Sequence, residues 1–327
     1  MSLLSSLKKC ITPATGRAFS MLLPAIFIFV FAAVFVPFVG PFFLFLLPMI
    51  LFLNGAVNGT IKTSAVYFFS FFLLLSIAVM SRLDVPAFAV FTMGAAGIFM
   101  AQFAGKNFSA ERTVIYPALF IIGAVCFYFG YDAVTLGANP WVLVKNFITT
   151  TIRESVKFYS QMPLKTEDIQ IIKDNEKNII NGFIQIFPSM IVILSVFIIW
   201  ANLLLGKNYL GRAGIVYPKL AMLARWKAPD GIIWIFIISG ALLFVPQKDI
   251  NFIDLNVFLV VCFIYLLQGL AIVSFLFQTK NVPVFIRYLF YFFVAVQQLL
   301  MIPITAIGLF DIWVDFRKHI QKNQAAD

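Results

Sequence analysis

Few side chains in this sequence are of the types that carry catalysis. The single histidine, His319, lies near the carboxy terminus, so this chain supplies neither an HExxH zinc motif nor a Ser-His pair inside an apolar segment. The cysteines Cys10, Cys126 and Cys262 are far apart and show no CxxC spacing, which argues against a metal site or a disulfide framework. No GxxxxGK[ST] motif is present. We therefore expect no enzymatic activity, metal or cofactor, and any ATP-driven step would need a partner protein.

Amides are the polar side chains that recur inside the apolar runs. In one interpretation they line a pocket for an uncharged or zwitterionic small molecule. In the other they join neighbouring helices, at roughly 0.6 kcal/mol per hydrogen bond in a membrane. The sequence leaves both interpretations open, and Asn58 and Asn256 are further amides of the same kind. The solute-pocket candidates are Asn54, Gln102, Gln185, Asn202, Gln268, Gln297 and Gln298.

Basic residues are concentrated in the segment 206–230, which contains Asp230 as its only acid. A plain interpretation is a connector at the membrane surface, with Trp226 as an interfacial anchor. The alternative is a docking surface for a cytoplasmic partner or for anionic lipid headgroups. The docking candidates are Arg212, Lys219, Arg225, Trp226 and Lys227.

Small residues recur at intervals of four in two places. Gly97, Ala101 and Gly105 would give one apolar run a flat face for close helix packing, and Ala14 and Ala18 have the same spacing nearer the amino terminus. We expect packing within the chain as the ordinary role of both sets.

The composition of the chain indicates the class of protein to which it belongs. The chain is 62% hydrophobic and only 12% charged, with a mean hydropathy of +0.97, whereas soluble domains are about 45–50% apolar. The net charge of +10 is spread over short breaks between apolar runs, which indicates orientation in a bilayer and not nucleic-acid binding. The sequence therefore predicts an all-α, polytopic transmembrane helical bundle.

Apolar runs of about 20 residues are long enough to cross the hydrocarbon core, and we count about eight or nine. Five precede residue 131 and about four occupy 181–310. Between them, 132–180 is polar with apolar residues at helical spacing, which predicts amphipathic helices in an extracytoplasmic insertion, and 311–327 is a polar tail. We expect one membrane domain over 1–327. The predicted spans are 19–39, 41–57, 63–81, 86–104, 114–131, 181–205, 231–247, 254–277 and 284–310.

Positive charge predicts the orientation. With a cytoplasmic amino terminus, four basic breaks fall on the cytoplasmic side, as the positive-inside rule requires. Arg317, Lys318 and Lys322 in the tail are the exception, because nine crossings would place them outside. Either the tail is outside or the count of spans is wrong by one.

Three segments of the second half resemble a known family. Ala224–Asp230 (ARWKAPD), Tyr265–Phe275 (YLLQGLAIVSF) and Gly308–Lys318 (GLFDIWVDFRK) together resemble the YybS-like bacterial membrane proteins. That family is in turn distantly similar to the substrate-binding S components of energy-coupling-factor vitamin transporters. Those components bind a vitamin near the outer face and dock, through small residues of the first helix, to a membrane protein that recruits ATPases. The resemblance makes Ala14 and Ala18 the docking candidates, although Arg17 lies between them.

Three functions remain open on these grounds. The first is a small-solute-binding transporter component in the bacterial cytoplasmic (inner) membrane, which would depend on partner ATPase subunits for energy. The second is a non-catalytic scaffold for envelope machinery. The third, lipid handling, would use Arg287 and the basic segment to hold headgroup phosphates. Membrane lipids are expected partners in each case.

Overall fold

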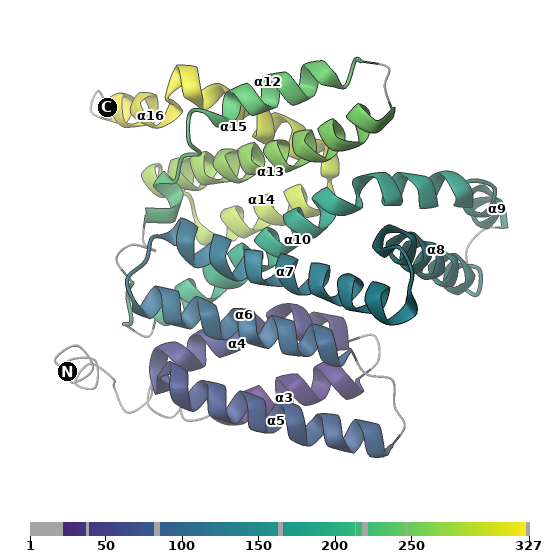
Figure 1. Cartoon of the computed structure of the whole chain (residues 1–327). Coiled ribbons are helices and arrows are strands. Elements are labelled where there is room, and N and C mark those ends of the chain that lie inside the picture. Colours follow the sequence, from purple (N-terminus) through teal and green to yellow (C-terminus); the bar gives the residue numbers. More distant parts are fainter. Residues whose placement is uncertain are drawn as a thin grey trace. The chain divides into compact units, whose positions relative to one another are not determined.

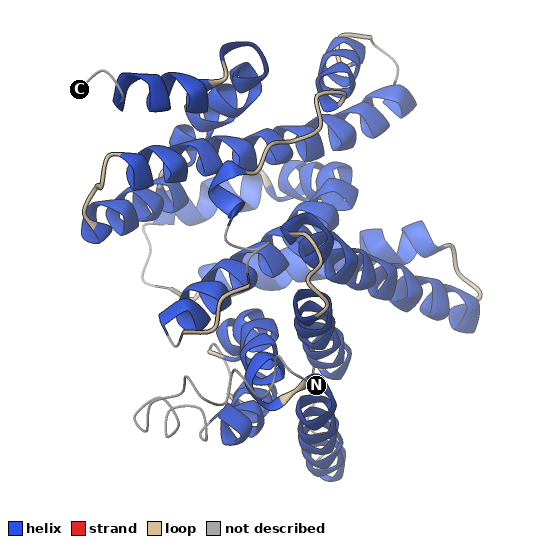
Figure 2. Cartoon of the chain, turned by 90° about the vertical axis from the view of Figure 1, so that its left-hand side faces the viewer, coloured by secondary structure: helices blue, strands red, loops and turns tan. Residues whose placement is uncertain are grey.

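The computed structural model describes residues 22–36, 39–81, 86–162, 166–212, 214–217, 222–245 and 248–324. The described residues are mostly helical and include no β-strand, which confirms an all-α polytopic bundle (Figure 2). Backbone packing divides the chain into two compact units. Unit 1 comprises residues 1–126 and 194–222, and unit 2 comprises 127–193 and 223–327. Helices α7 (Ala110–Leu136) and α10 (Glu176–Arg212), both labelled in Figure 1, each contribute residues to both units. The expectation of one membrane domain stays a prediction.

Unit 1 is built around α4, which packs against α3 and α6. Its apolar core includes the fully buried Leu47, Leu51 and Tyr67. The Tyr67 hydroxyl donates a hydrogen bond of 2.8 Å to the Val90 carbonyl, so this polar atom is satisfied inside the core. Besides parts of α7 and α10, the helices of this unit are α3 (Leu22–Phe35), α4 (Gly40–Asn58), α5 (Thr60–Met80) and α6 (Ala87–Gly105).

Unit 2 is built around the long helix α13, which packs against α12, α15 and α16. Tyr265 of α13 is fully buried in a small core with Ile233 and Val261. Besides α10, the elements after α7 are α8 (Pro140–Tyr159), α9 (Thr166–Asp174), η1 (Met222–Arg225), α12 (Ile232–Leu242), α13 (Lys248–Thr279), α14 (Val284–Val296), η2 (Gln298–Leu300), α15 (Met301–Val314) and α16 (Phe316–Gln324).

Six of the described helices are long and apolar enough to cross a membrane: α4, α5, α6, α7, α10 and Asn251–Thr279 of α13. The predicted spans 19–39 and 231–247 fall on the shorter apolar helices Pro24–Phe35 and Ile232–Leu242. The predicted single span 284–310 is instead two helices, Val284–Val296 and Gln298–Val314, bent by 106°. Apolar composition marked this region correctly, but it carries no information on whether the helix continues through Gln297.

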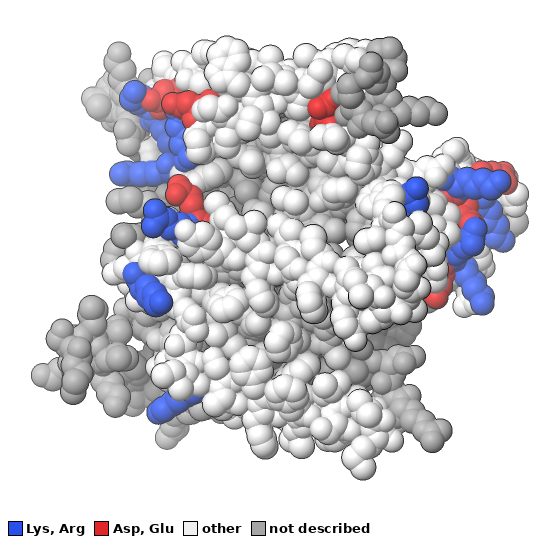
Figure 3. Space-filling view, viewed as in Figure 1, with Lys and Arg blue, Asp and Glu red and all other residues white. Residues whose placement is uncertain are grey.

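The polar insertion forms the two amphipathic helices α8 and α9, which lie side by side (Figure 1). Helix α8 begins after Asn139, whose side chain accepts a hydrogen bond of 2.8 Å from the Trp141 N–H, with Pro140 in the first turn. An ion pair of 3.2 Å joins Arg153 of α8 to Glu176 at the start of α10. Charged side chains gather over α8 and α9 in Figure 3, as expected for a segment outside the hydrocarbon.

Candidate functional site: a buried ion pair that joins three segments

The polar network of unit 2 is centred on Asp311, near the end of α15. Its side chain is only 1% exposed. One carboxylate oxygen accepts hydrogen bonds from Arg317 Nη1 at 2.8 Å and from Gln268 Nε2 at 3.0 Å, and the other accepts from the Phe316 N–H at 3.0 Å. Three donors, one of them a guanidinium, therefore compensate for the loss of hydration of this buried charge.

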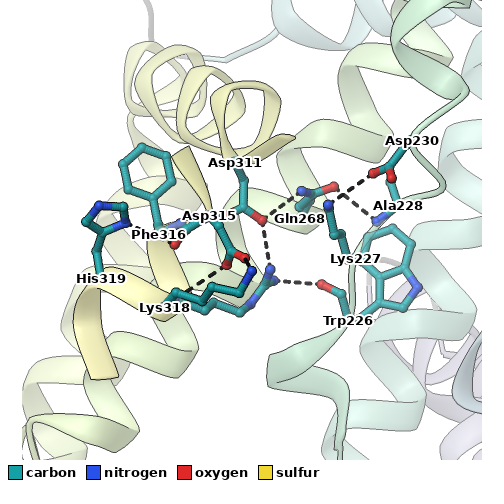
Figure 4. A network of polar contacts seen from close by, with 11 residues as sticks. Trp226, Lys227, Ala228, Asp230, Gln268, Asp311, Asp315, Phe316, Lys318 and His319 are labelled. Carbon is teal, nitrogen blue, oxygen red and sulfur yellow. Dashed lines mark hydrogen bonds and ion pairs between the residues drawn. The ribbon is translucent and has the colours of Figure 1, made fainter. Parts of the chain in front are cut away.

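The same network holds the connector that precedes α12 (Figure 4). Gln268 accepts a hydrogen bond of 3.0 Å from the Ala228 N–H through its Oε1. Arg317 donates a bond of 2.7 Å from Nη2 to the Trp226 carbonyl. Residues of the three segments 224–230, 265–275 and 308–318 thus meet in one set of contacts, although up to 91 positions separate the bonded residues.

Close helix packing places Asp311 beside Gln268. A Cβ added at Gly308 of α15 would collide with the Tyr265 carbonyl and the Gly269 backbone of α13, and one added at Gly269 would collide with the Ile304 carbonyl of α15. The two backbones therefore touch where both helices carry glycine, as small residues allow in membrane proteins. This contact brings α15 near enough for Asp311 to reach the amide of Gln268.

A tight turn after α15 returns Arg317 to the carboxylate. Asp315 adopts a left-handed conformation (φ 46°), which aspartate tolerates better than most residues. Its Oδ1 accepts from the Lys318 N–H, at 3.4 Å, and its Oδ2 pairs with Lys318 Nζ at 2.8 Å. The hydrogen bond from the Lys318 side chain holds the pKa of Asp315 below its ordinary value.

Exposed basic side chains lie on the two segments that the buried pair joins, the connector and α16. Arg225, Lys227 and Lys318 are exposed, and we call these three residues the basic face. Lys227 pairs with Asp230 at 3.0 Å, but both groups are largely in solvent, so this pair contributes little stability.

The other docking candidates differ in their surroundings. Trp226 is half-buried, and the exposed Arg212 belongs to unit 1. Lys219 lies outside the described residues.

Two of the amides in the apolar runs bridge breaks in neighbouring helices. In α4, Pro48 interrupts the helix, and Asn202 of α10 inserts its amide between the Met49 N–H (3.0 Å to Oδ1) and the Phe45 carbonyl (2.8 Å from Nδ2). These two backbone groups would bond each other in a regular α-helix. Asn202 therefore replaces one intrahelical bond with two interhelical ones.

Asn256 of α13 does the same at Pro188 of α10. It accepts from the Ser189 N–H at 2.8 Å and donates to the Gln185 carbonyl at 2.8 Å. Both asparagines also donate to the carbonyl four residues earlier in their own helix, Ile198 and Phe252 respectively. These two amides and that of Gln268 are therefore engaged in joining elements, which is the helix-joining interpretation of the sequence.

The other solute-pocket candidates have different surroundings. Asn54 is buried and donates to the Ile50 carbonyl of its own helix at 3.0 Å, and Gln102 of α6 is half-buried. Gln185 is exposed, and Gln297 and Gln298 are exposed at the bend between α14 and α15.

The small residues of α6 face α4. A Cβ added at Gly97 would meet the Pro48 backbone, and one added at Gly55 would meet Ala101, whereas the position of Gly105 is open. Ala14 and Ala18 lie outside the described residues.

Arg287, considered above for headgroup binding, donates to the Val282 and Phe277 carbonyls at 2.8 and 3.0 Å. Within the part of the chain that the structure describes, no group of three His, Cys, Asp or Glu side chains could hold a metal ion.

Arg317 and Asp311 were not predicted as a pair. The signal available in the sequence was an acid six residues before an arginine at the end of an apolar run, but such a spacing does not show that the chain turns back. The sequence pattern instead places both residues in the polar tail 311–327.

The fold and the network define a polytopic helical membrane protein, and comparison with known proteins places it in a family. Residues 25–312 match the family described as "Predicted membrane protein (DUF2232)", and the chain belongs to that family. It is similar to the uncharacterized protein YybS of Bacillus subtilis (strain 168), with 23% identity over 309 residues that cover 88% of this chain and 92% of the relative. No solved structure gives a significant match. The resemblance to YybS-like membrane proteins is thereby confirmed.

Proposed function

We propose that this protein is a non-enzymatic component of the bacterial cytoplasmic membrane that acts through a protein partner bound at the basic face. One observation carries this proposal: the buried Arg317–Asp311 pair fastens the carboxy-terminal helix to the connector before α12. The two segments that carry Lys227 and Lys318 are thereby held in one arrangement.

The energetics support a role in positioning. Burying an ion pair is often no more stabilising than packing apolar side chains in the same space. The pair does, however, fix which segments lie together, since its donors and acceptors come from α13, α15, α16 and the connector. A fixed set of surface cations can recognise an acidic partner surface with less loss of side-chain freedom than a mobile tail.

The first form of this function is the solute-binding part of a transporter, powered by a partner because the chain contains no P-loop. The similarity of YybS-like proteins to S components supports this form. The second form is a scaffold beside envelope machinery. The engagement of Asn202 and Gln268 in contacts between elements supports the scaffold, since these two amides are already hydrogen-bonded without a solute.

The proposal includes an orientation with both chain ends in the cytoplasm. Arg317 of the tail bonds to the carbonyl of Trp226, so the tail and the basic connector share one end of unit 2. A re-entrant α14–α15 hairpin, which the 106° bend permits, would leave an even number of crossings and satisfy the positive-inside rule for the tail as well.

The test is identification of whatever co-purifies with the tagged protein after gentle extraction from its native membrane. We expect a protein partner with the wild type and its loss in the double variant Arg225→Glu/Lys227→Glu. The matched control is Lys173→Glu/Lys177→Glu, which reverses two exposed charges near the α9–α10 junction.

The identity of the co-purified molecules distinguishes the forms of the function. ATPase subunits with a stoichiometric solute support the transporter form, and envelope-synthesis proteins without solute support the scaffold. Equal recovery of the partner from the Arg225/Lys227 variant would rule out docking at the basic face. Retention of anionic phospholipid alone would favour lipid handling instead.

A further inference from the structure

A second polar cluster lies in the first turns of α13. Asp254 is buried, at 8% exposure, and its Oδ2 has no hydrogen-bond partner. The Oδ1 of Asn251, one turn earlier, is also buried and without a hydrogen-bond partner. Residues three apart share a helix face, so these two oxygens lie on the same side of α13. Both atoms are hydrogen-bond acceptors when the carboxyl group is ionised.

The neighbouring helix α12 packs on the same part of α13. Phe258, one turn after Asp254 on the same face, packs on Phe236 of α12 with ring centroids 5.1 Å apart, and a Cβ at Gly240 would touch it. Helices α12 and α13 run antiparallel there, and α12 ends at Leu242. The carbonyl end of a helix carries a partial negative charge.

Among the described side chains, none donates a hydrogen bond to either of these two oxygens. Burying a carboxylate without a partner is among the costliest arrangements in a protein. The contrast is Asn256, two residues later, whose amide makes three hydrogen bonds. Helix α13 therefore satisfies one buried polar side chain completely and leaves two acceptors open.

We propose that Asp254 and Asn251 bind a monovalent cationic group, either an alkali metal ion or the ammonium group of a solute. Carboxylate and amide oxygens are the ligands that hard cations prefer. A single carboxylate balances a single positive charge. The site is separate from the basic face, since Asp254 lies 14 residues, or about 21 Å along α13, before Gln268. It goes beyond the proposed docking function and does not depend on it.

The test uses the purified full-length protein in lipid nanodiscs at pH 8, without partners. The temperature of half-unfolding is measured against increasing NaCl, KCl or methylammonium chloride, with choline chloride keeping the ionic strength constant. We expect a rise that saturates with at least one of these cations. Saturation with an alkali ion alone identifies a metal-ion site, and saturation with methylammonium alone identifies the headgroup of a solute.

Three variants test whether the cations stabilise the protein by binding at Asp254 and Asn251. Asp254→Asn, which keeps the shape of the side chain, should abolish the response, and Asn251→Ala should shift its midpoint at least tenfold to higher concentration. Glu154→Gln removes the same charge from an exposed position on α8 and should respond like the wild type. No saturable response in the wild type, or an equal response in Asp254→Asn, overturns the proposal. If Asp254→Asn does not fold, an unshifted midpoint in Asn251→Ala overturns it.

Discussion

At the scale of single residues, the buried charges of unit 2 are the most sensitive positions. Asp311 and Arg317 are 1% and 12% exposed in their side chains, so neither can regain full hydration when its partner is lost. The Arg317 Nε is itself buried without a hydrogen-bond partner, so the guanidinium already has one unsatisfied donor before any bond to Asp311 is removed.

Removing one partner of this pair should be strongly destabilising. We expect Arg317→Met or Asp311→Asn to lower the free energy of unfolding by about 3–5 kcal/mol, because each leaves a buried group uncompensated. Thermal or denaturant unfolding in detergent would measure this loss. Lys318→Met, which breaks only the exposed pair with Asp315, should leave the stability close to that of the wild type. Similar losses for Arg317→Met and Lys318→Met would contradict a special role for the buried pair.

The asparagines at the helix breaks should also matter individually. Asn202→Leu removes the interhelical bonds to the Met49 N–H and the Phe45 carbonyl, and Asn256→Leu removes those to the Ser189 N–H and the Gln185 carbonyl. We expect each variant to lose about 1–3 kcal/mol of stability. Gln185→Leu, which changes an exposed side chain of α10, should stay within about 0.5 kcal/mol of the wild type. An Asn202→Leu variant as stable as Gln185→Leu would show that the amide bridge is dispensable.

The turn before α16 predicts a pH dependence. The pKa of Asp315 is lowered chiefly by the hydrogen bond from Lys318, so the charged carboxylate is favoured in the folded state. The folding stability that the charged Asp315 contributes is present above the unfolded pKa, about 3.9, and is lost as the pH falls through the folded pKa. Carboxyl NMR should find the Asp315 pKa closer to its ordinary value in Lys318→Gln. An unchanged pKa would mean that Lys318 does not hold this carboxylate.

At the scale of elements, the contact between α13 and α15 depends on the absence of side chains. We expect Gly269→Ala and Gly308→Ala to disrupt the contact, because the added methyl group would meet backbone, which cannot rotate away. Loss of cooperative thermal unfolding would report the disruption. At Gly182 of α10 nothing lies within 4 Å of an added Cβ, so Gly182→Ala should instead stabilise by about 0.5–1 kcal/mol. Equal effects at all three glycines would contradict a packing role.

Sequence reasoning succeeded for elements defined by local periodicity. The apolar runs and the amphipathic helices α8 and α9 depend on residues close together in the chain, and both were predicted. The bend at Gln297 was missed because hydropathy does not distinguish a straight span from a broken one. The partners of Asn202 and Gln268 were also missed, since their bonds join residues between 40 and 157 positions apart. Asp254 was overlooked because it was the first residue of a predicted span, where an acid usually meets water.

At the scale of the whole molecule, the proposed orientation can be tested with single cysteines. After replacement of the native cysteines, Lys322→Cys in α16 should react with a membrane-impermeant maleimide only in permeabilised cells, because the tail shares the side of the basic connector. Glu154→Cys in α8 should react in intact cells. Labelling of Lys322→Cys in intact cells would place the tail outside and exclude the re-entrant interpretation of α14 and α15.

The division into units also constrains how the protein is made. Unit 1 is not continuous, since it needs residues 194–222 as well as the first 126. The Met49 N–H meets its partner Asn202 only after 153 further residues. At about 5–20 residues per second, the ribosome needs roughly 8–30 s to supply that partner. During this interval helix α4 lacks the contact with Asn202 that it makes in the folded protein, so the newly synthesised amino-terminal half must wait in the membrane before unit 1 is complete.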